Sequence, residues 1–328
     1  MGSARHRRAR PPEEGGRGPA PPPGRRGALL LGLCAGIALQ PFCAAVEGPE
    51  FDQVRAWKHL EALVAIGPRP AGSEGAEATR VYIERELRAA GLEPRREGFT
   101  AQTPIGPVEM ANVYADIPGA GKPEAPAPMI VLCTHYETKR MPFHFVGAND
   151  SGSGTAALLE LARSLAPRAG GRFTYRILFL DGEEAMRPHW EDPDNRYGSR
   201  HHVQELKKSG AIAHVKACVL LDLVGDRDLR LMRDEYSNQQ FLNAFFEAAR
   251  EIGLGQHVGG RSEPIKDDHL SFLEGGIESV DLIDLDYGPS NSYWHSAEDT
   301  LDKCSADSLG AIGRIVLHGL PKLERLLR

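Results

Sequence analysis

Residues 176–185 read Arg-Ile-Leu-Phe-Leu-Asp-Gly-Glu-Glu-Ala, an apolar run that leads to two adjacent glutamates, Glu183 and Glu184. A short run of aliphatic and aromatic residues is typical of a buried strand. In open α/β sheets, ligands bind outside the carboxyl ends of the strands. Two neighbouring carboxylates repel each other unless a cation or a proton lies between them. The stretch therefore predicts a buried strand that delivers carboxylates to a functional site.

Four other segments also place a potential metal ligand at or near the end of an apolar run. They are His135 in MIVLCTHYE, Asp150 in VGANDSGSG, Asp222 in ACVLLDLVG and His295 in YWHSAEDT. Each residue alone could equally be a hydrogen-bonded structural residue, and Asp150 could be the N-cap of a helix. Five such segments in one chain favour a single shared site.

The apolar periodicity predicts strands alternating with helices, which indicates an α/β fold. The strands are expected at 112–117, 129–136, 176–180, 218–224 and 280–285, and the helices at 51–65, 73–90, 155–166, 198–208, 238–252 and 307–327. The sequence thus predicts a single domain with a mixed, mostly parallel open sheet covered by helices on both faces. Pro321 is expected to kink the last helix.

The N-terminal part has the composition of a leader. Residues 1–27 are rich in Arg, Pro and Gly, which predicts disorder. Residues 28–45 combine an apolar run with small residues that suit signal-peptide cleavage, and Arg25 and Arg26 supply the positive flank. We expect export to the periplasm or the medium, with no stable membrane span after cleavage. The alternative is an anchor formed by an uncleaved N-terminal segment. Residues 50–328 remain as the catalytic domain.

Charge and cysteine content narrow the classes of partner. The chain carries a net charge of −6, and removal of the leader leaves 32 basic and 43 acidic residues, a net charge of −11. Such a surface repels phosphate backbones, so nucleic acid is excluded as an expected partner. The three remaining cysteines, Cys133, Cys218 and Cys304, give no disulfide framework and are expected to be buried thiols.

The ligand types point to zinc. A catalytic zinc site uses three protein ligands and keeps one position open. Asp150, Glu184 and His295 would make such a set, whereas His135 and Asp222 would add a second half-site that shares Asp150. Glu183 lies beside a ligand but points elsewhere, so it is placed to act as a base.

Several ordered motifs resemble the zinc aminopeptidase-type family, which also contains the glutaminyl cyclases. They are His135-Tyr-Glu137, Gly147-Ala-Asn-Asp150-Ser-Gly-Ser-Gly, Asp181-Gly-Glu-Glu-Ala185, Leu221-Asp222 and Trp294-His295. Trp190, the stretch 197–201 and Asp267-Asp-His269-Leu-Ser-Phe272 are similar to the glutaminyl-peptide cyclotransferase branch. The segments 103–107 and 134–138 are similar to its bacterial members. The resemblance covers about residues 50–328.

The resemblance implies a zinc-aminopeptidase-like fold with one zinc ion on Asp150, Glu184 and His295. It also implies that Glu183 is the proton shuttle, that Asp222 and Asp267 form a carboxylate network beside it, and that Trp190 and Trp294 line the substrate pocket. The implied activity is cyclisation of N-terminal glutamine, in peptides or proteins, to pyroglutamate with release of ammonia.

Two other functions remain open at this point. One is a dizinc aminopeptidase, with a second ion on His135, Asp150 and Asp222. The other, more remote, is a non-catalytic peptide-binding protein. The chain also departs from the animal cyclases, which have His where Asp281 aligns and Asp in place of Glu137. Among the remaining histidines, His269 is the best further candidate for the site because it follows two aspartates.

Overall fold

The computed structural model describes residue 18, residues 50–122 and residues 124–328. The expected disordered leader, apart from Gly18, and the expected signal segment therefore lie outside the described residues. Within the described ranges, no helix is both long enough and apolar enough to cross a lipid bilayer.

A six-stranded sheet forms the centre of the fold, in the strand order β1-β2-β4-β3-β5-β8. The strands are β1 (Arg95–Thr103), β2 (Gly106–Ile117), β3 (Met129–His135), β4 (Thr174–Leu180), β5 (Val215–Asp222) and β8 (Ser279–Ile283). Strands β4, β3, β5 and β8 are parallel to one another, and the β1–β2 hairpin adds to β4 in antiparallel fashion. A separate two-stranded sheet pairs β6 (Leu231–Asp234) with β7 (Val258–Glu263). The predicted mixed, mostly parallel open sheet is confirmed.

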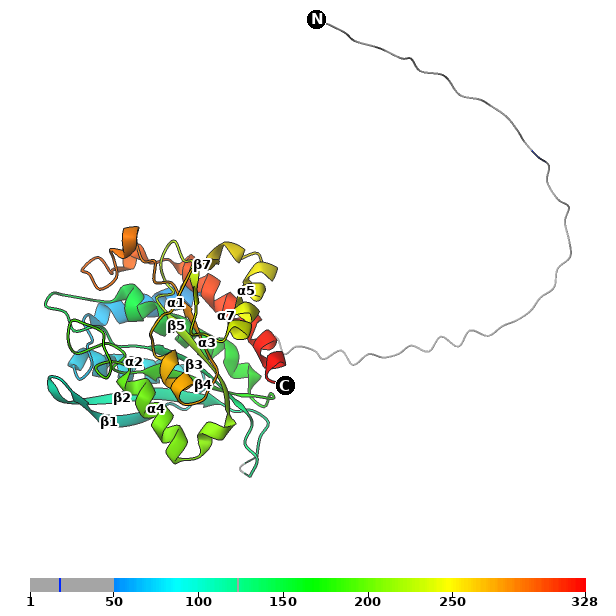
Figure 1. The fold of residues 1–328 in the computed structure, drawn as a ribbon, viewed down its shortest axis with the longest axis horizontal. Coiled ribbons are helices and arrows are strands. Elements are labelled where there is room, and N and C mark those ends of the chain that lie inside the picture. The colour runs from blue at the N-terminus through cyan, green and yellow to red at the C-terminus, as the bar shows by residue number, and fades with distance from the viewer. Residues whose placement is uncertain (1–17, 19–49, 123) are drawn as a thin grey trace, which may run out of the picture. The chain divides into compact units, whose positions relative to one another are not determined.

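Helices cover both faces of this sheet, as predicted (Figure 1). One face packs against α1 (Gln53–Ile66), α2 (Glu74–Ala89), α3 (Gly154–Leu165), α5 (Gln239–Glu251) and α7 (Ala306–Leu326). The other packs against α4 (Tyr197–Lys208) and α6 (His269–Glu274). Side chains alternate between the two faces, so that Leu132 packs in the larger apolar cluster and its neighbour Cys133 in the smaller one. Both faces are therefore buried, which explains the continuous apolar strands.

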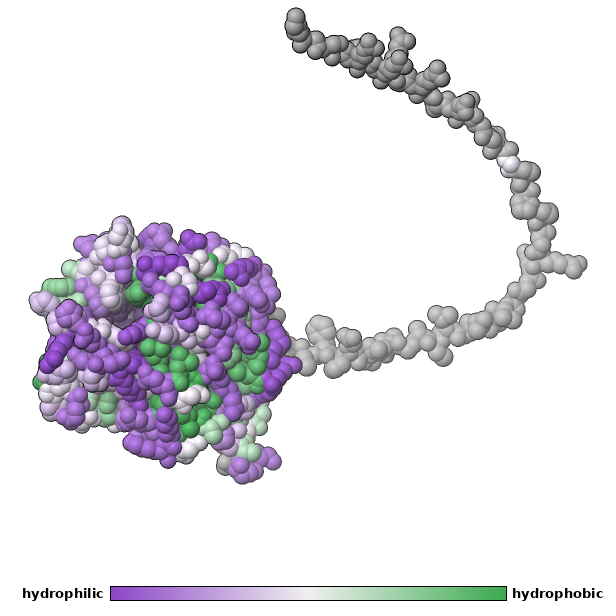
Figure 2. All heavy atoms as spheres, viewed as in Figure 1, coloured by the Kyte–Doolittle hydropathy of each residue, from purple (hydrophilic) through white to green (hydrophobic). Residues whose placement is uncertain are grey.

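Six short helical segments complete the described secondary structure. They are a π-helical turn at Ala148–Ser153 and 3₁₀ turns at Ala166–Arg168, Ala211–His214, Gly255–His257, Pro289–Asn291 and Leu301–Lys303. The surface turned to the viewer in Figure 2 is mainly hydrophilic, with smaller apolar areas between the polar ones.

The structure contains four elements that the sequence analysis did not predict, namely β1, β6, β7 and the short helix α6. The hairpin strand β1 was not predicted, because its sequence RREGFTAQT is mostly polar and buries only Ala101. Such a pattern fits an edge strand that packs weakly. The last helix continues to Leu326 with Pro321 inside it. Leu320 and Leu323 on either side of the proline are fully buried, so packing holds the helix together there.

Cys133, Cys218 and Cys304 are free, buried thiols, as predicted. Cys133 and Cys218 lie on the neighbouring strands β3 and β5, with their sulfur atoms 3.4 Å apart.

A single buried arginine ties the segment after α1 to the chain between β3 and α3. The Arg69 side chain is completely buried and donates hydrogen bonds to the carbonyl oxygens of Tyr136 at 2.8 Å, Val146 at 2.6 Å and Gly147 at 2.8 Å. It also contacts the Ser151 hydroxyl at 3.2 Å. These bonds fix both ends of the segment that follows β3.

We expect Arg69→Lys to lower the free energy of unfolding by about 2–4 kcal/mol. An ammonium cannot reproduce the planar fork of the guanidinium, and each buried carbonyl that loses its donor costs about 1–3 kcal/mol. Urea unfolding measures the loss. Arg85→Lys is the matched control, because Arg85 is 66% exposed and its partners are the adjacent Glu86 and the ring of Tyr82. Equal stability of the two variants would contradict the role assigned to Arg69.

Candidate active site

The ligand-type residues selected from the sequence converge at the carboxyl end of the sheet. His135 is the last residue of β3, Asp222 is the last residue of β5, and Glu183 and Glu184 follow β4 by a few residues. Asp150, His295 and Asp267 arrive from turns outside the sheet, the first of them from the Ala148–Ser153 turn that precedes α3. All of these residues except His135 line one pocket, and His135 lies behind it in contact with Asp150 and Asp222.

Asp150, Glu184 and His295 form a group that could hold a metal ion, because one donor atom of each lies within 4.8 Å of the others. His295 Nε2 is 2.7 Å from Glu184 Oε1 and 3.2 Å from Asp150 Oδ2. The second oxygen of Glu184, Oε2, accepts a bond from Lys139 Nζ at 2.9 Å. One imidazole nitrogen and two carboxylate oxygens beside a pocket are the donor types of a catalytic zinc site, so these residues fit that metal.

His135, Asp150 and Asp222 form a second group of the same kind. His135 Nε2 is 3.3 Å from Asp150 Oδ1 and 3.2 Å from Asp222 Oδ1. Burial disfavours the charged form of Asp150, but hydrogen bonds from His135 and His295 lower the pKa of its carboxyl below the usual value. Asp150 is thus shared by both groups and is held as a carboxylate.

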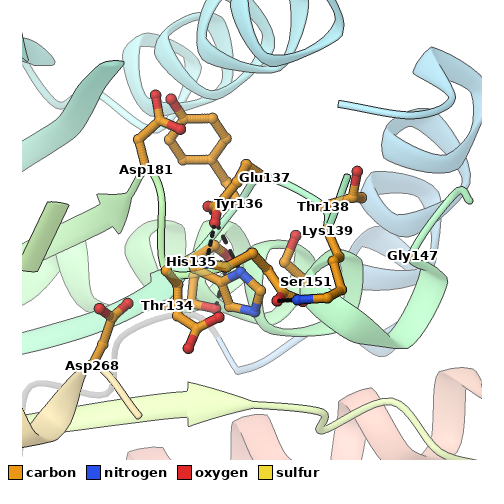
Figure 3. Close-up of polar contacts among 12 residues, drawn as sticks. Thr134, His135, Tyr136, Glu137, Thr138, Lys139, Gly147, Ser151, Asp181 and Asp268 are labelled. Carbon is orange, nitrogen blue, oxygen red and sulfur yellow. Dashed lines mark hydrogen bonds and ion pairs between the residues drawn. The ribbon is translucent and has the colours of Figure 1, made fainter. Parts of the chain in front are cut away.

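Glu137 contacts one member of each group, Glu184 and His135. Its Oε1 accepts the backbone N–H of Glu184 at 3.0 Å, and its Oε2 lies 3.7 Å from His135 Nδ1. Figure 3 shows His135, Glu137 and Lys139 on the one segment that leaves β3. Three residues of this segment therefore act on the two candidate ligand groups.

Glu183 differs from Glu184 in its surroundings. The Trp190 indole Nε1 donates a hydrogen bond to Glu183 Oε1 at 2.8 Å. Burial, followed by the charges of Asp267 and Glu184, raises the pKa of Glu183 well above its usual value. Burial and the neighbouring Asp222 likewise raise the pKa of Asp267. A carboxyl with a raised pKa is suited to accept and return a proton near neutral pH.

The pocket beside these groups has a volume of about 200 Å³. Two indoles, Trp190 and Trp294, form part of its wall, and the Trp294 ring stacks on His295 at a centroid distance of 4.0 Å. The remaining lining residues are Asp150, Glu183, Glu184, Asp222, Leu223, Glu263, Pro264, Ile265, Lys266, Asp267, Ile283, Leu285 and His295. The pocket thus combines apolar side chains with five buried acids, Asp150, Glu183, Glu184, Asp222 and Asp267, which we call its base.

His269 lies apart from this pocket. It is fully buried, with Nε2 3.1 Å from Asp234 Oδ2 and Nδ1 3.7 Å from Asp281 Oδ2. It does not line the pocket. The expectation that His269 is the best further site histidine is therefore wrong, because the ring turns between two buried carboxylates instead.

Asp299 was missed by the sequence reasoning, although it follows His295 by only four residues. Its carboxylate accepts the backbone N–H groups of Asn149 at 2.7 Å and Asp150 at 3.1 Å, and the Tyr287 hydroxyl at 2.8 Å. Burial and the charge of Asp150 raise the pKa of Asp299 to about 7. Asp299 thus fixes the backbone that carries Asp150. A buried acid in a polar stretch gives no periodic signal, so only the structure reveals it.

The segment that delivers His295 contains backbone in the left-handed region. Ser290, Asn291 and His295 have φ angles of 55°, 59° and 52°. Non-glycine residues in this region carry a conformational cost, which is often found at functional sites.

The model of Peptidase family M28 matches residues 112–320. The chain belongs to peptidase family M28. Among curated proteins, this M28 chain is 30% identical over 302 residues to the glutaminyl-peptide cyclotransferase-like protein of Bos taurus, a match that covers 81% of the chain and 75% of the relative.

Solved structures of the same type are also similar to this M28 chain. A glutaminyl cyclase from an Acidobacteriales bacterium superposes with a TM-score of 0.80 at 35% identity, covering 88% of this chain and 98% of that one. A leucine aminopeptidase precursor from Bacteroides thetaiotaomicron gives a TM-score of 0.71 at 26% identity, covering 82% and 97%. Solved structures named as a glutaminyl cyclase and as a leucine aminopeptidase precursor thus share this fold.

We expect Asp299→Asn to weaken zinc binding by about 10- to 100-fold, since residues that orient a metal ligand typically contribute this much to metal affinity. Competition with a chelator measures the affinity without any assay of activity. Asp302→Asn is the control, because Asp302 is exposed and pairs with Lys303 and Thr300. Equal zinc affinity in the two variants would show that Asp299 does not position Asp150.

Proposed function

We propose that the protein is a zinc-dependent glutaminyl-peptide cyclotransferase, which converts the N-terminal glutamine of peptides or proteins to pyroglutamate and releases ammonia. The observation that carries the proposal is the difference between the adjacent glutamates, which both line the pocket. Glu184 shares a ligand group with Asp150 and His295, whereas Glu183, which lies near His135 and Glu137, accepts the Trp190 N–H and has a raised pKa. The names of the similar proteins from Bos taurus and the Acidobacteriales bacterium support it.

In this proposal, Asp150, Glu184 and His295 hold one zinc ion. The ion, when bound, supplies a Lewis acid that polarises the γ-amide carbonyl of the substrate. Lys139 occupies the outer oxygen of Glu184, which leaves Oε1 for the metal.

Glu183 moves the proton of the reaction. The α-amine of the substrate attacks the γ-carbonyl carbon, and Glu183 accepts the proton that the amine loses. Glu183 then returns this proton to the amide nitrogen, which leaves as ammonia while the lactam ring closes. Asp222 and Asp267 act beside it as a carboxylate network, and Trp190 holds Glu183 through its indole N–H. Trp294 and Trp190 enclose the glutaminyl side chain.

The second candidate is a dizinc aminopeptidase, because His135, Asp150 and Asp222 form a further ligand group. In that enzyme Glu183 would activate the attacking water, and two zinc ions would be present. A non-catalytic peptide-binding protein is the remote alternative, and it gives no role to a base at Glu183.

For the N-terminal part we propose export to the periplasm or the medium. The support is the apolar run 28–39 behind Arg25 and Arg26, followed by small residues near Ala45. The catalytic domain in this proposal spans residues 50–328.

Product analysis separates the candidate functions. Purified, zinc-loaded protein is incubated with Gln-peptides and with amino-acid amides, and the products are identified by mass spectrometry. A peptide that loses one ammonia and keeps its length indicates the cyclase. Release of a free N-terminal residue indicates the peptidase and would refute the proposal, as would the absence of both products.

The two glutamates are expected to fail differently. Glu183→Gln keeps the size of the side chain but removes the base, so turnover should fall by about 10²–10⁴-fold while zinc content persists. Glu184→Gln, like Asp150→Ala and His295→Ala, should lose zinc together with activity, whereas Asp222→Ala should keep one zinc ion. Metal analysis and steady-state kinetics of each variant test this division. It is mistaken if Glu183→Gln loses zinc while Glu184→Gln retains it.

Trp190→Phe should lower kcat by about 10-fold or more with little change in KM. The variant keeps an aromatic wall but removes the N–H that binds Glu183, and a hydrogen bond to a charged group contributes about 1.5–3 kcal/mol. Trp294→Phe provides the comparison, because the Trp294 indole N–H has no partner among the described residues, so its effect should fall on KM. If both variants change KM alone, Trp190 serves only as a wall.

A further inference from the structure

The mouth of the pocket is bordered by the short segment 263–267, which joins β7 to α6. Its side chains alternate in direction: Ile265 and Asp267 are buried, whereas Lys266 between them is exposed. Both Lys266 and Asp267 nevertheless line the pocket. Lys266 therefore stands at the outer edge, directly beside a carboxyl of the acidic base.

Lys266 is the only lysine or arginine among the described residues that line the pocket. It makes no hydrogen bond or ion pair with any residue that the structure describes, so its ammonium is free to meet a ligand. This segment carries two acidic lining residues: Asp267 is buried and makes no ion pair with Lys266, and Glu263 is paired with Arg261 at 2.9 Å. The charge of Lys266 thus remains uncompensated at the mouth.

The two ends of the pocket have opposite charge. Its base carries Asp150, Glu183, Glu184, Asp222 and Asp267, and its mouth carries the Lys266 ammonium. A peptide whose N-terminal amine faces the base must place its second residue about 3.8 Å further out, which is the spacing of successive Cα atoms. The Cα atoms of Lys266 and Asp267, as neighbours in the chain, are separated by the same spacing. The flexible four-carbon side chain of Lys266 lets its ammonium reach the side chain of this second residue.

We propose that Lys266 selects substrates with a carboxylate on the residue that follows the N-terminal glutamine. This inference rests on the proposed cyclase function and names the substrate class within it. The carboxylate can be an Asp or Glu side chain, or the terminal carboxylate of a dipeptide. The chain as a whole has a net charge of −6, which would favour cationic rather than acidic peptides. An acidic preference would therefore have a local origin.

An exposed ion pair contributes about 0.2–1 kcal/mol, and a like-charge contact costs a similar amount. The ratio of kcat/KM for Gln-Glu-amide over Gln-Lys-amide should therefore be about 2- to 30-fold at low salt. It should shrink toward unity at about 1 M salt, where the screening length is about 3 Å.

The experiment compares Gln-Glu-amide, Gln-Ala-amide, Gln-Lys-amide and Gln-Ala with a free carboxylate on zinc-loaded enzyme. The first and last peptides separate a side-chain carboxylate from a terminal one. Lys266→Gln should abolish the preference for carboxylates and Lys266→Glu should reverse it. Lys216→Gln, a change of an exposed lysine at the opposite end of β5 from Asp222, should leave it unchanged.

Equal kcat/KM for the four peptides, or a preference that survives Lys266→Gln, would overturn the inference while leaving the cyclase function intact. Absence of cyclisation of every peptide would instead refute the proposed function, and this inference with it. Circular dichroism and zinc content verify that the Lys266 variants are folded and loaded.

Discussion

The need to balance buried negative charge governs this structure. Glu137, Asp150, Glu183, Glu184, Asp222 and Asp267 all lie buried at the carboxyl end of one sheet. A buried carboxylate is costly unless it is paired, hydrogen-bonded or protonated. The protein places cations or hydrogen-bond donors beside some of these carboxylates and leaves others with a raised pKa.

Pairing applies to the carboxylates of the two ligand groups. Asp150 lies between His135 and His295, and Glu184 lies between His295 and Lys139. Glu183 differs, because its partner is an indole N–H rather than a cation and burial raises its pKa well above the usual value. The same constraint therefore gives the proposed metal ligand Glu184 and the proposed proton carrier Glu183 different surroundings, although the two glutamates are neighbours in the sequence.

The sequence was sufficient to predict the strands that end near His135, Glu183 and Asp222, because their apolar runs are local and continuous. It was also sufficient to predict that Asp150 and His295 meet them, since the motifs resemble a known family. Arg69 and Asp299 could not be found in this way. Each acts on backbone groups far away in the chain, Arg69 on Tyr136 to Gly147 and Asp299 on Asn149 and Asp150. Such long-range contacts leave no periodic pattern in the sequence. The edge strand β1 is likewise mostly polar, so it also lacks an apolar pattern that would predict it.

The left-handed backbone around His295 gives the site a dynamic property. Ser290, Asn291 and His295 hold conformations that each cost of order 1–3 kcal/mol, so we expect the segment that carries this candidate ligand to open more readily than the buried sheet. An ion bound by His295 would add its binding free energy to the closed form of the segment, since ligands stabilise the state to which they bind. Opening of residues 290–295 and release of the metal are then one coupled equilibrium. The rate of amide hydrogen exchange in this segment consequently reports metal occupancy, while exchange in β3 and β5 reports unfolding of the domain.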